Sequence, residues 1–249
     1  MRNLESSVRI KSARSVDALA AMGRMVDVLP PPSASSSTVS NPLVPLFQHF
    51  AEVKDLGRTE LVIVNLLLPH VPISTVPEYL EGNILRELDT IDAANLRANI
   101  LCGILLRKSE PVADDEERDR AILSSILPLF DDGRPATLLL NLTRYLLPQL
   151  FSARPSIISS LLTQLSEIQH GENRFSSWIS VASLGVSSGH LDIADLPEGD
   201  LQDAIAHADT SVRLRAFQLL IGSKNVLRQD VLRLIKKSLA YNAVLPSAG

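Results

Sequence analysis

Apolar side chains recur along this chain at helical spacing, in blocks that return every 34 to 42 residues. The blocks centre on Val62, Leu96, Leu138, Trp178 and Val212, at successive intervals of 34, 42, 40 and 34 residues. After Val212 and after Leu96, an arginine comes next and apolar residues follow four, five and eight positions on. These offsets lie on one face of a helix. A helix pair repeated at this period cannot bury its apolar face alone, so it packs against its neighbours.

Local signals place the ends of these helices. Asp114–Glu117 puts negative charge where free N–H groups favour it, and Asp209 opens an N-cap cluster. Gly133 and Pro135 end one helix and begin the next, and no apolar run alternates with period two. We therefore predict helices over residues 42–53, 58–69, 77–89, 93–108, 113–130, 135–150, 155–169, 173–186, 199–207, 210–222 and 228–241.

These observations predict an all-α fold, a HEAT/armadillo-like right-handed α-solenoid of stacked helix pairs. Asp209-x-x-Val212-Arg213-x-x-Ala216-x-x-x-Leu220 resembles the second-helix signature of HEAT repeats. A helical domain without repeats is the alternative. We expect an N-terminal helix over residues 1–28, a linker over 29–41 that is rich in Pro and Ser, and a helical-repeat domain over 42–249.

Composition excludes several classes of protein. The single cysteine, Cys102, rules out a disulfide framework and a cysteine-rich zinc site, and it fits a reducing compartment. No histidine lies three or four residues from another, so no metal or cofactor is expected. No run of about 20 strongly apolar residues is present, so we predict no membrane span and a cytoplasmic protein.

One stretch matches an enzyme motif. Gly185-Val186-Ser187-Ser188-Gly189 fits G-x-S-x-G, which holds a nucleophilic serine on a turn between a strand and a helix. The preceding residues read as a helix and the following ones, with Pro197, as a loop. We therefore interpret the stretch as a helix C-cap and expect no enzyme activity.

Charge is distributed unevenly along the chain. The net charge is −4, yet residues 201–249 hold seven basic and three acidic side chains. A basic strip in this part is the candidate nucleic-acid-binding site, and its neutralisation of phosphates would be insensitive to sequence. An ordinary solvated helix face is the alternative. The strip consists of Arg213, Arg215, Lys224, Arg228, Arg233, Lys236 and Lys237.

The last fifty residues also resemble a known family. A helix ending near His207, the Asp209-x-x-Val212-Arg213 helix, a Ser223-Lys224 turn and a helix ending in Asn242 are similar to a stretch of the THADA-like family. The resemblance implies a long helical-repeat protein that directs a tRNA 2′-O-ribose methyltransferase to position 32 of the anticodon loop. This chain would then be an N-terminal piece of such a scaffold.

The resemblance has limits that bear on function. Family members are far longer, and the chain lacks their Arg-Arg-Ser-Ala-Gly-Leu-Pro stretch, so no functional residue is carried over. The implied partners are a methyltransferase subunit, which would supply S-adenosylmethionine binding and chemistry, and tRNA. A HEAT/armadillo scaffold for protein–protein interaction, unrelated to RNA, is the second hypothesis.

Overall fold

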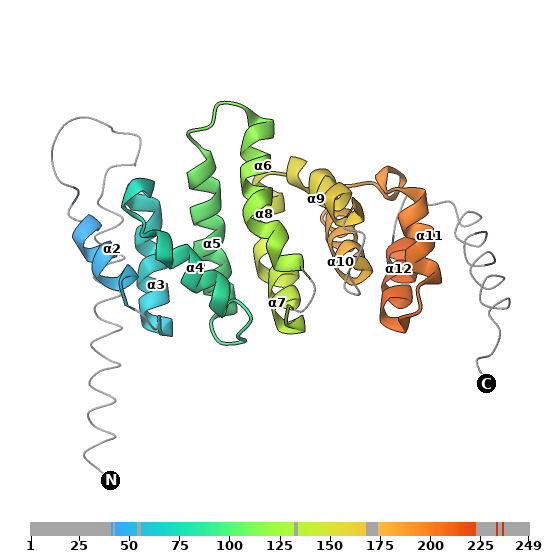
Figure 1. The fold of residues 1–249 in the computed structure, drawn as a ribbon, viewed down its shortest axis with the longest axis horizontal. Coiled ribbons are helices and arrows are strands. Elements are labelled where there is room, and N and C mark those ends of the chain that lie inside the picture. Colours follow the sequence, from blue (N-terminus) through green and yellow to red (C-terminus); the bar gives the residue numbers. More distant parts are fainter. Residues whose placement is uncertain are drawn as a thin grey trace, which may run out of the picture. The chain divides into compact units, whose positions relative to one another are not determined.

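The computed structural model describes residues 41, 43–53, 56–131, 134–167, 174–222, 233 and 236 (Figure 1). These residues form helices and turns and contain no strand, which confirms the all-helical prediction for this part of the chain. The predicted helix over 1–28 and the linker over 29–41, except Asn41, lie outside the described residues. So does most of the predicted helix over 228–241, of which Arg233 and Lys236 are helical and exposed. The chain divides into two compact units, Met1–Pro111 and Val112–Gly249.

The described part of the first unit contains two helix pairs. Helix α2 packs on α3, α4 packs on α5, and α3 contacts α5, so one pair covers the apolar face of the next. Gly103 lets α5 come close to the turn after α3, because a Cβ there would lie 3.0 Å from Leu68 Cδ2. The elements are α2 (Leu43–Ala51), α3 (Arg58–Leu67), the 3-10 turns η1 (Leu68–His70) and η2 (Ile73–Thr75), α4 (Glu78–Glu87) and α5 (Ala94–Ser109).

The second unit continues this pattern. Helix α9 packs on α10 and α11 packs on α12, while α10 contacts both α8 and α12. The second helices of these two pairs, α10 and α12, thus touch, which is repeat-like packing. The elements are α6 (Asp115–Ile126), η3 (Leu127–Phe130), α7 (Ala136–Asn141), a π-helical turn η4 (Leu142–Leu146), α8 (Leu147–Ala153), α9 (Ser156–Glu167), α10 (Arg174–Ser187), η5 (Ile193–Asp195), α11 (Glu198–Ala206) and α12 (Thr210–Gly222).

The predicted helix signals operate as expected. The Asp114 side chain accepts a hydrogen bond from Glu116 N at 3.1 Å, so it caps α6. Asp209 accepts from Ser211 N at 2.7 Å and caps α12 in the same way. At the end of α10, His190 N and Leu191 N donate to the Gly185 carbonyl, with Gly189 at a φ of 75°. This is a helix C-cap, as predicted for the G-x-S-x-G stretch.

Proline accounts for the π-helical turn in the second unit. The predicted helix over 135–150 is present, but it runs from Ala136 to Ala153 and includes the π-helical turn η4. Pro148 lies at the start of α8, where it has no N–H to donate to the carbonyl of Arg144 and its ring would clash with that carbonyl. The wider turn before Pro148 separates these groups and lets the helix continue.

Candidate functional site

The described members of the predicted basic strip differ in how far they are exposed to solvent. Arg215, Arg233 and Lys236 are exposed, and Arg213 is half-buried. Lys224, Arg228 and Lys237 lie outside the described residues. Arg213 and Arg215 stand on α12.

Arg213 holds the turn that precedes its own helix. Its Nη1 donates to the carbonyls of His207 and Ala208, at 2.5 and 2.7 Å, and its Nη2 donates to Thr210 Oγ1 at 2.9 Å. The arginine at the matching position of α5, Arg97, also donates to a carbonyl of the turn before its helix. The arginine of the repeated apolar-Arg pattern is thus an anchor for the preceding turn.

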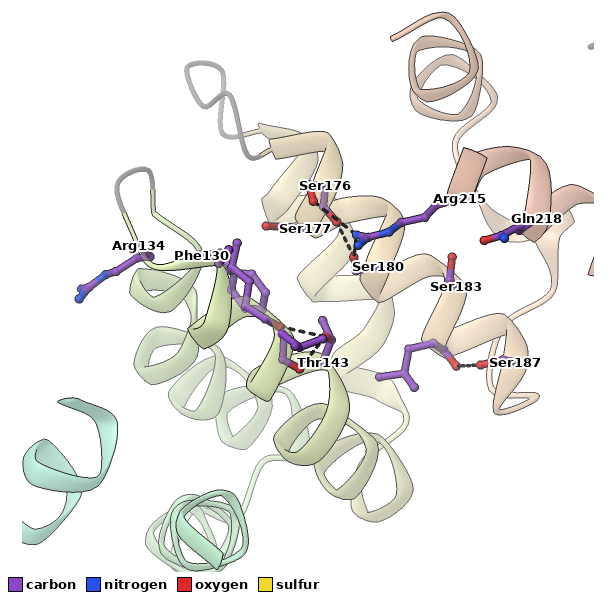
Figure 2. Close-up of a pocket in the computed structure, with 14 residues that line it drawn as sticks. Phe130, Arg134, Thr143, Ser176, Ser177, Ser180, Ser183, Ser187, Arg215 and Gln218 are labelled. Atoms are coloured by element: carbon purple, nitrogen blue, oxygen red, sulfur yellow. Dashed lines mark hydrogen bonds between the residues drawn. The ribbon is translucent and has the colours of Figure 1, made fainter. Parts of the chain in front are cut away.

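Arg215 instead lines a groove in the second unit (Figure 2). The groove has a volume of about 560 Å³ and lies among α7, η4, α10 and α12. Its apolar lining comes mainly from Phe130, Leu139, Leu140 and Leu184. Six hydroxyl side chains, from Thr143, Ser176, Ser177, Ser180, Ser183 and Ser187, also line it.

Four of these hydroxyls form what we term the serine stripe. Ser176, Ser180, Ser183 and Ser187 are spaced by four, three and four residues, so they share one face of α10. At a rise of 1.5 Å per residue the stripe is about 16 Å long. Ser180 Oγ donates to the carbonyl of Ser176 at 2.5 Å, and Ser187 Oγ donates to that of Leu184 at 3.1 Å. These hydroxyl oxygens retain lone pairs that can accept further hydrogen bonds.

The cation of the groove is held against this stripe. Arg215 Nη1 donates to Ser180 Oγ at 3.0 Å and lies 3.5 Å from Ser176 Oγ (Figure 2). Arg134 stands at the rim, where its Nε donates to the Pro128 carbonyl at 3.3 Å and its side chain points away from the cavity. No carboxylate is among the described residues that line the groove. Its charge is therefore positive.

Ser177 is the least expected member of the lining. It is only 3% exposed, and its Oγ has no hydrogen-bond partner among the described residues. In Figure 2 its hydroxyl lies on the side of α10 that faces Phe130, and the oxygen itself is buried. A buried hydroxyl without a partner costs free energy.

Two carboxylates of the second unit have clear structural roles. Hydrogen bonds from Ser211 at the start of α12 lower the pKa of Asp209. Asp119 accepts from Arg154 Nε at 2.5 Å, which ties α6 to the turn between α8 and α9. This hydrogen bond is the largest cause of the raised pKa of Arg154. Neither carboxylate lines the groove.

Other candidate chemistry has no support in the described part of the chain. Ser187 is the last residue of helix α10 and no strand precedes it in the described part of the chain, so the G-x-S-x-G stretch lacks the nucleophile geometry. No group of three His, Cys, Asp or Glu side chains there is placed to hold a metal ion. The helices there are all too short or too polar to cross a bilayer.

Sequence reasoning missed the groove itself. Residues 175–191 attract notice as an uncharged stretch rich in Ser and Gly, and only the G-x-S-x-G match within it suggests chemistry. The available signal was the spacing of the serines, which repeats with the helical period. The partners of the stripe come from α7 and α12, which the spacing alone does not bring together.

Comparison with known proteins gives one match. Residues 132–248, just under half of the chain, match the model of a family described as "Trm732, TPR repeats". Over this stretch, which includes the serine stripe and Arg215, the chain is similar to helical repeats of a tRNA-modification accessory family. No curated protein and no solved structure matches the chain.

Proposed function

We propose that this chain is a non-catalytic helical-repeat scaffold that directs a tRNA 2′-O-ribose methyltransferase to position 32 of the anticodon loop. The match of residues 132–248 to the "Trm732, TPR repeats" model carries the proposal. The resemblance of residues 201–242 to the THADA-like family supports it. The methyltransferase binds S-adenosylmethionine and performs the chemistry. This chain positions the tRNA, which contributes to rate without a catalytic residue of its own.

The proposed function includes a proposed arrangement of the helix pairs. The helix pairs form a HEAT/armadillo-like right-handed α-solenoid over residues 42–249, preceded by a linker and an N-terminal helix, in a cytoplasmic protein. Contacts of α3 with α5, and of α10 with α8 and α12, support it, because successive layers of a solenoid cover each other in this way.

The basic strip is part of the same proposal. Arg215, Arg233 and Lys236 are exposed and can neutralise tRNA phosphates, and Lys224, Arg228 and Lys237 complete the strip. Arg213 contributes least, because its guanidinium already binds the turn before α12. Replacing Arg233 and Lys236 together with Gln should weaken tRNA binding and reduce its dependence on salt, whereas unchanged binding would contradict this role.

A second candidate function has its own support. Leu214 and Ile221 on α12 are 56% and 72% exposed, and such apolar side chains suit a contact with another protein. In this alternative the chain is a HEAT/armadillo scaffold for protein–protein interaction, unrelated to RNA.

Affinity capture of the full chain from cells separates the two functions. Recovery of a ribose methyltransferase together with tRNA is expected. Adding the purified chain to that methyltransferase should then raise 2′-O-methylation at position 32 of a tRNA transcript. Recovery of trafficking or chaperone proteins alone, with no effect on methylation, would favour the second function and contradict the first.

A further inference from the structure

We propose that residues 228–241 pack as a helix on the exposed apolar side of α12, in the same chain. Most of these residues lie outside the described part of the structure. The packing is independent of the proposed role in tRNA methylation. It specifies side-chain contacts that the proposed stack of helix pairs leaves open.

The first step concerns the side of α12 that is open to solvent. Leu214, Phe217 and Ile221 are spaced by three and four residues, so they share one side of the helix. Leu214 is 56% and Ile221 is 72% exposed, while Phe217 is half-buried. Large apolar side chains aligned in this way mark a contact surface.

The second step concerns the direction in which this side faces. Arg215 Nη1 donates to Ser180 Oγ at 3.0 Å, so Arg215 marks the direction from α12 towards α10. At about 100° per residue, the centre of the apolar side lies roughly 130° around α12 from Arg215. Helix α12 therefore packs on the preceding helix pair with one side and presents apolar side chains where a next helix would lie.

The third step concerns the segment that fits this side. Leu232, Ile235 and Leu239 repeat the spacing of three and four residues found on α12. Arg233 and Lys236, which are helical and exposed, lie outside that apolar face. The segment thus offers apolar side chains over about 10 Å, the same length as on α12, with basic side chains beside them.

The short connection favours this segment over a separate protein. Helix α12 ends at Gly222, so five residues, 223–227, join it to the segment. Helix connections of this length join consecutive antiparallel helices that pack side by side. A segment on so short a tether also has an effective concentration in the millimolar range. A separate protein would have to compete with it for the same side chains.

Antiparallel packing fixes which side chains meet. Ile221, near the end of α12, pairs with Leu232, near the start of the segment. Leu214 then pairs with Leu239, and Phe217 packs against the middle of the segment. This register makes the inference testable residue by residue.

Two double-cysteine variants of the full chain test the register. Leu214→Cys with Leu239→Cys should be joined within one chain by a short bismaleimide. Leu214→Cys with Leu232→Cys should be joined several-fold more slowly, because residue 232 lies about 10 Å further along the helix. The native Cys102 is 5% exposed and the pKa of its thiol is about 11, so it reacts little. Mass spectrometry of tryptic peptides identifies the linked residues.

A stability measurement tests whether the same side chains are buried. Ile221→Ser should lower the melting temperature of the full chain, followed by Trp178 fluorescence, by roughly 3–10 °C, because it removes apolar surface from a packed contact. The matched control is Leu140→Ser on α7, in the same unit, where the side chain is 56% exposed. This control should shift the melting temperature by less than about 2 °C.

Several results would overturn the inference. Equal linkage in the two double-cysteine variants would contradict the register, and equal melting shifts for Ile221→Ser and Leu140→Ser would contradict burial. Linkage between two chains would identify a second copy as the occupant. Fast modification of Leu214→Cys by a monofunctional maleimide would show that this side of α12 stays open to another protein, as the second candidate function requires.

Discussion

Cys102 shows how burial controls the chemistry of a single residue. It is 5% exposed on α5, and desolvation raises the pKa of its thiol to about 11. The thiolate is disfavoured in the folded protein because water cannot solvate it there. At neutral pH the buried thiol of Cys102 is therefore protonated, and it is chemically unreactive.

This shift predicts a loss of stability at alkaline pH. Because the folded state holds the proton more tightly, the stabilisation is complete below pH 9 and declines as the pH rises towards 11. Between pH 8 and about 10.5, the free energy of unfolding should fall by roughly 1–2 kcal/mol more in the original chain than in Cys102→Ala. Urea titration of both proteins at the two pH values measures the difference, and equal losses would show that the thiol is not desolvated.

Ala93 carries strain of a different kind. It precedes α5 with a φ of 53°, in the left-handed region that side chains disfavour. Ala93→Gly should therefore raise the free energy of unfolding by about 0.5–1 kcal/mol. The matched control is Ala121→Gly within α6, where φ is helical and glycine should cost about 1 kcal/mol. Thermal melts of the two variants should shift in opposite directions; a loss of stability in both would rule out strain at Ala93.

Among the elements, α5 and α12 share an arginine anchor, and in α5 it is nearly buried. Arg97 is 7% exposed and its Nη2 lies 3.1 Å from Glu87 Oε2, so it joins α5 to the end of α4. Arg97→Met would remove both the ion pair and the bond to the turn, and it should cost about 3 kcal/mol. Arg86→Met, at a side chain that is 70% exposed beside the same Glu87, should change stability by less than about 0.5 kcal/mol. Similar losses in chemical denaturation of the two variants would contradict a role for burial.

The positions of the elements could be predicted from sequence where one local cause decides them. Asp114 caps α6 and Asp209 caps α12 because each has a carboxylate beside the first free N–H groups. The π-helical turn before Pro148 was not predicted, because apolar spacing does not show which hydrogen-bond ladder a helix adopts. The role of Arg213 was missed for a similar reason, since a positive charge in sequence does not show which carbonyl it will meet.

Local sequence patterns do not predict the groove. Each serine of the stripe is unremarkable in sequence, and only the packing of α10 against α12 brings Arg215 to them. The site depends on contacts between residues more than 30 positions apart, which no local pattern encodes.

At the scale of the whole molecule, each unit has its own buried core. Leu101 in the first unit and Leu150 in the second are fully buried. The stability of stacked repeats is close to a sum of local terms and neighbour contacts, so damage to one part need not unfold the rest. The single tryptophan, Trp178, is 1% exposed in the second unit, and its fluorescence reports unfolding there alone.

Because the chain divides into two units, we expect a core substitution in one unit to leave the stability of the other almost unchanged. Leu101→Ala should cost about 2–5 kcal/mol in the first unit. Part of the helical circular dichroism should then be lost at lower urea, while the midpoint of Trp178 fluorescence changes little. Leu150→Ala should instead shift the fluorescence midpoint, because its cavity lies in the same unit as the tryptophan. If both variants moved both signals equally, the two units would unfold as one cooperative block, and the groove could not be treated as a property of the second unit alone.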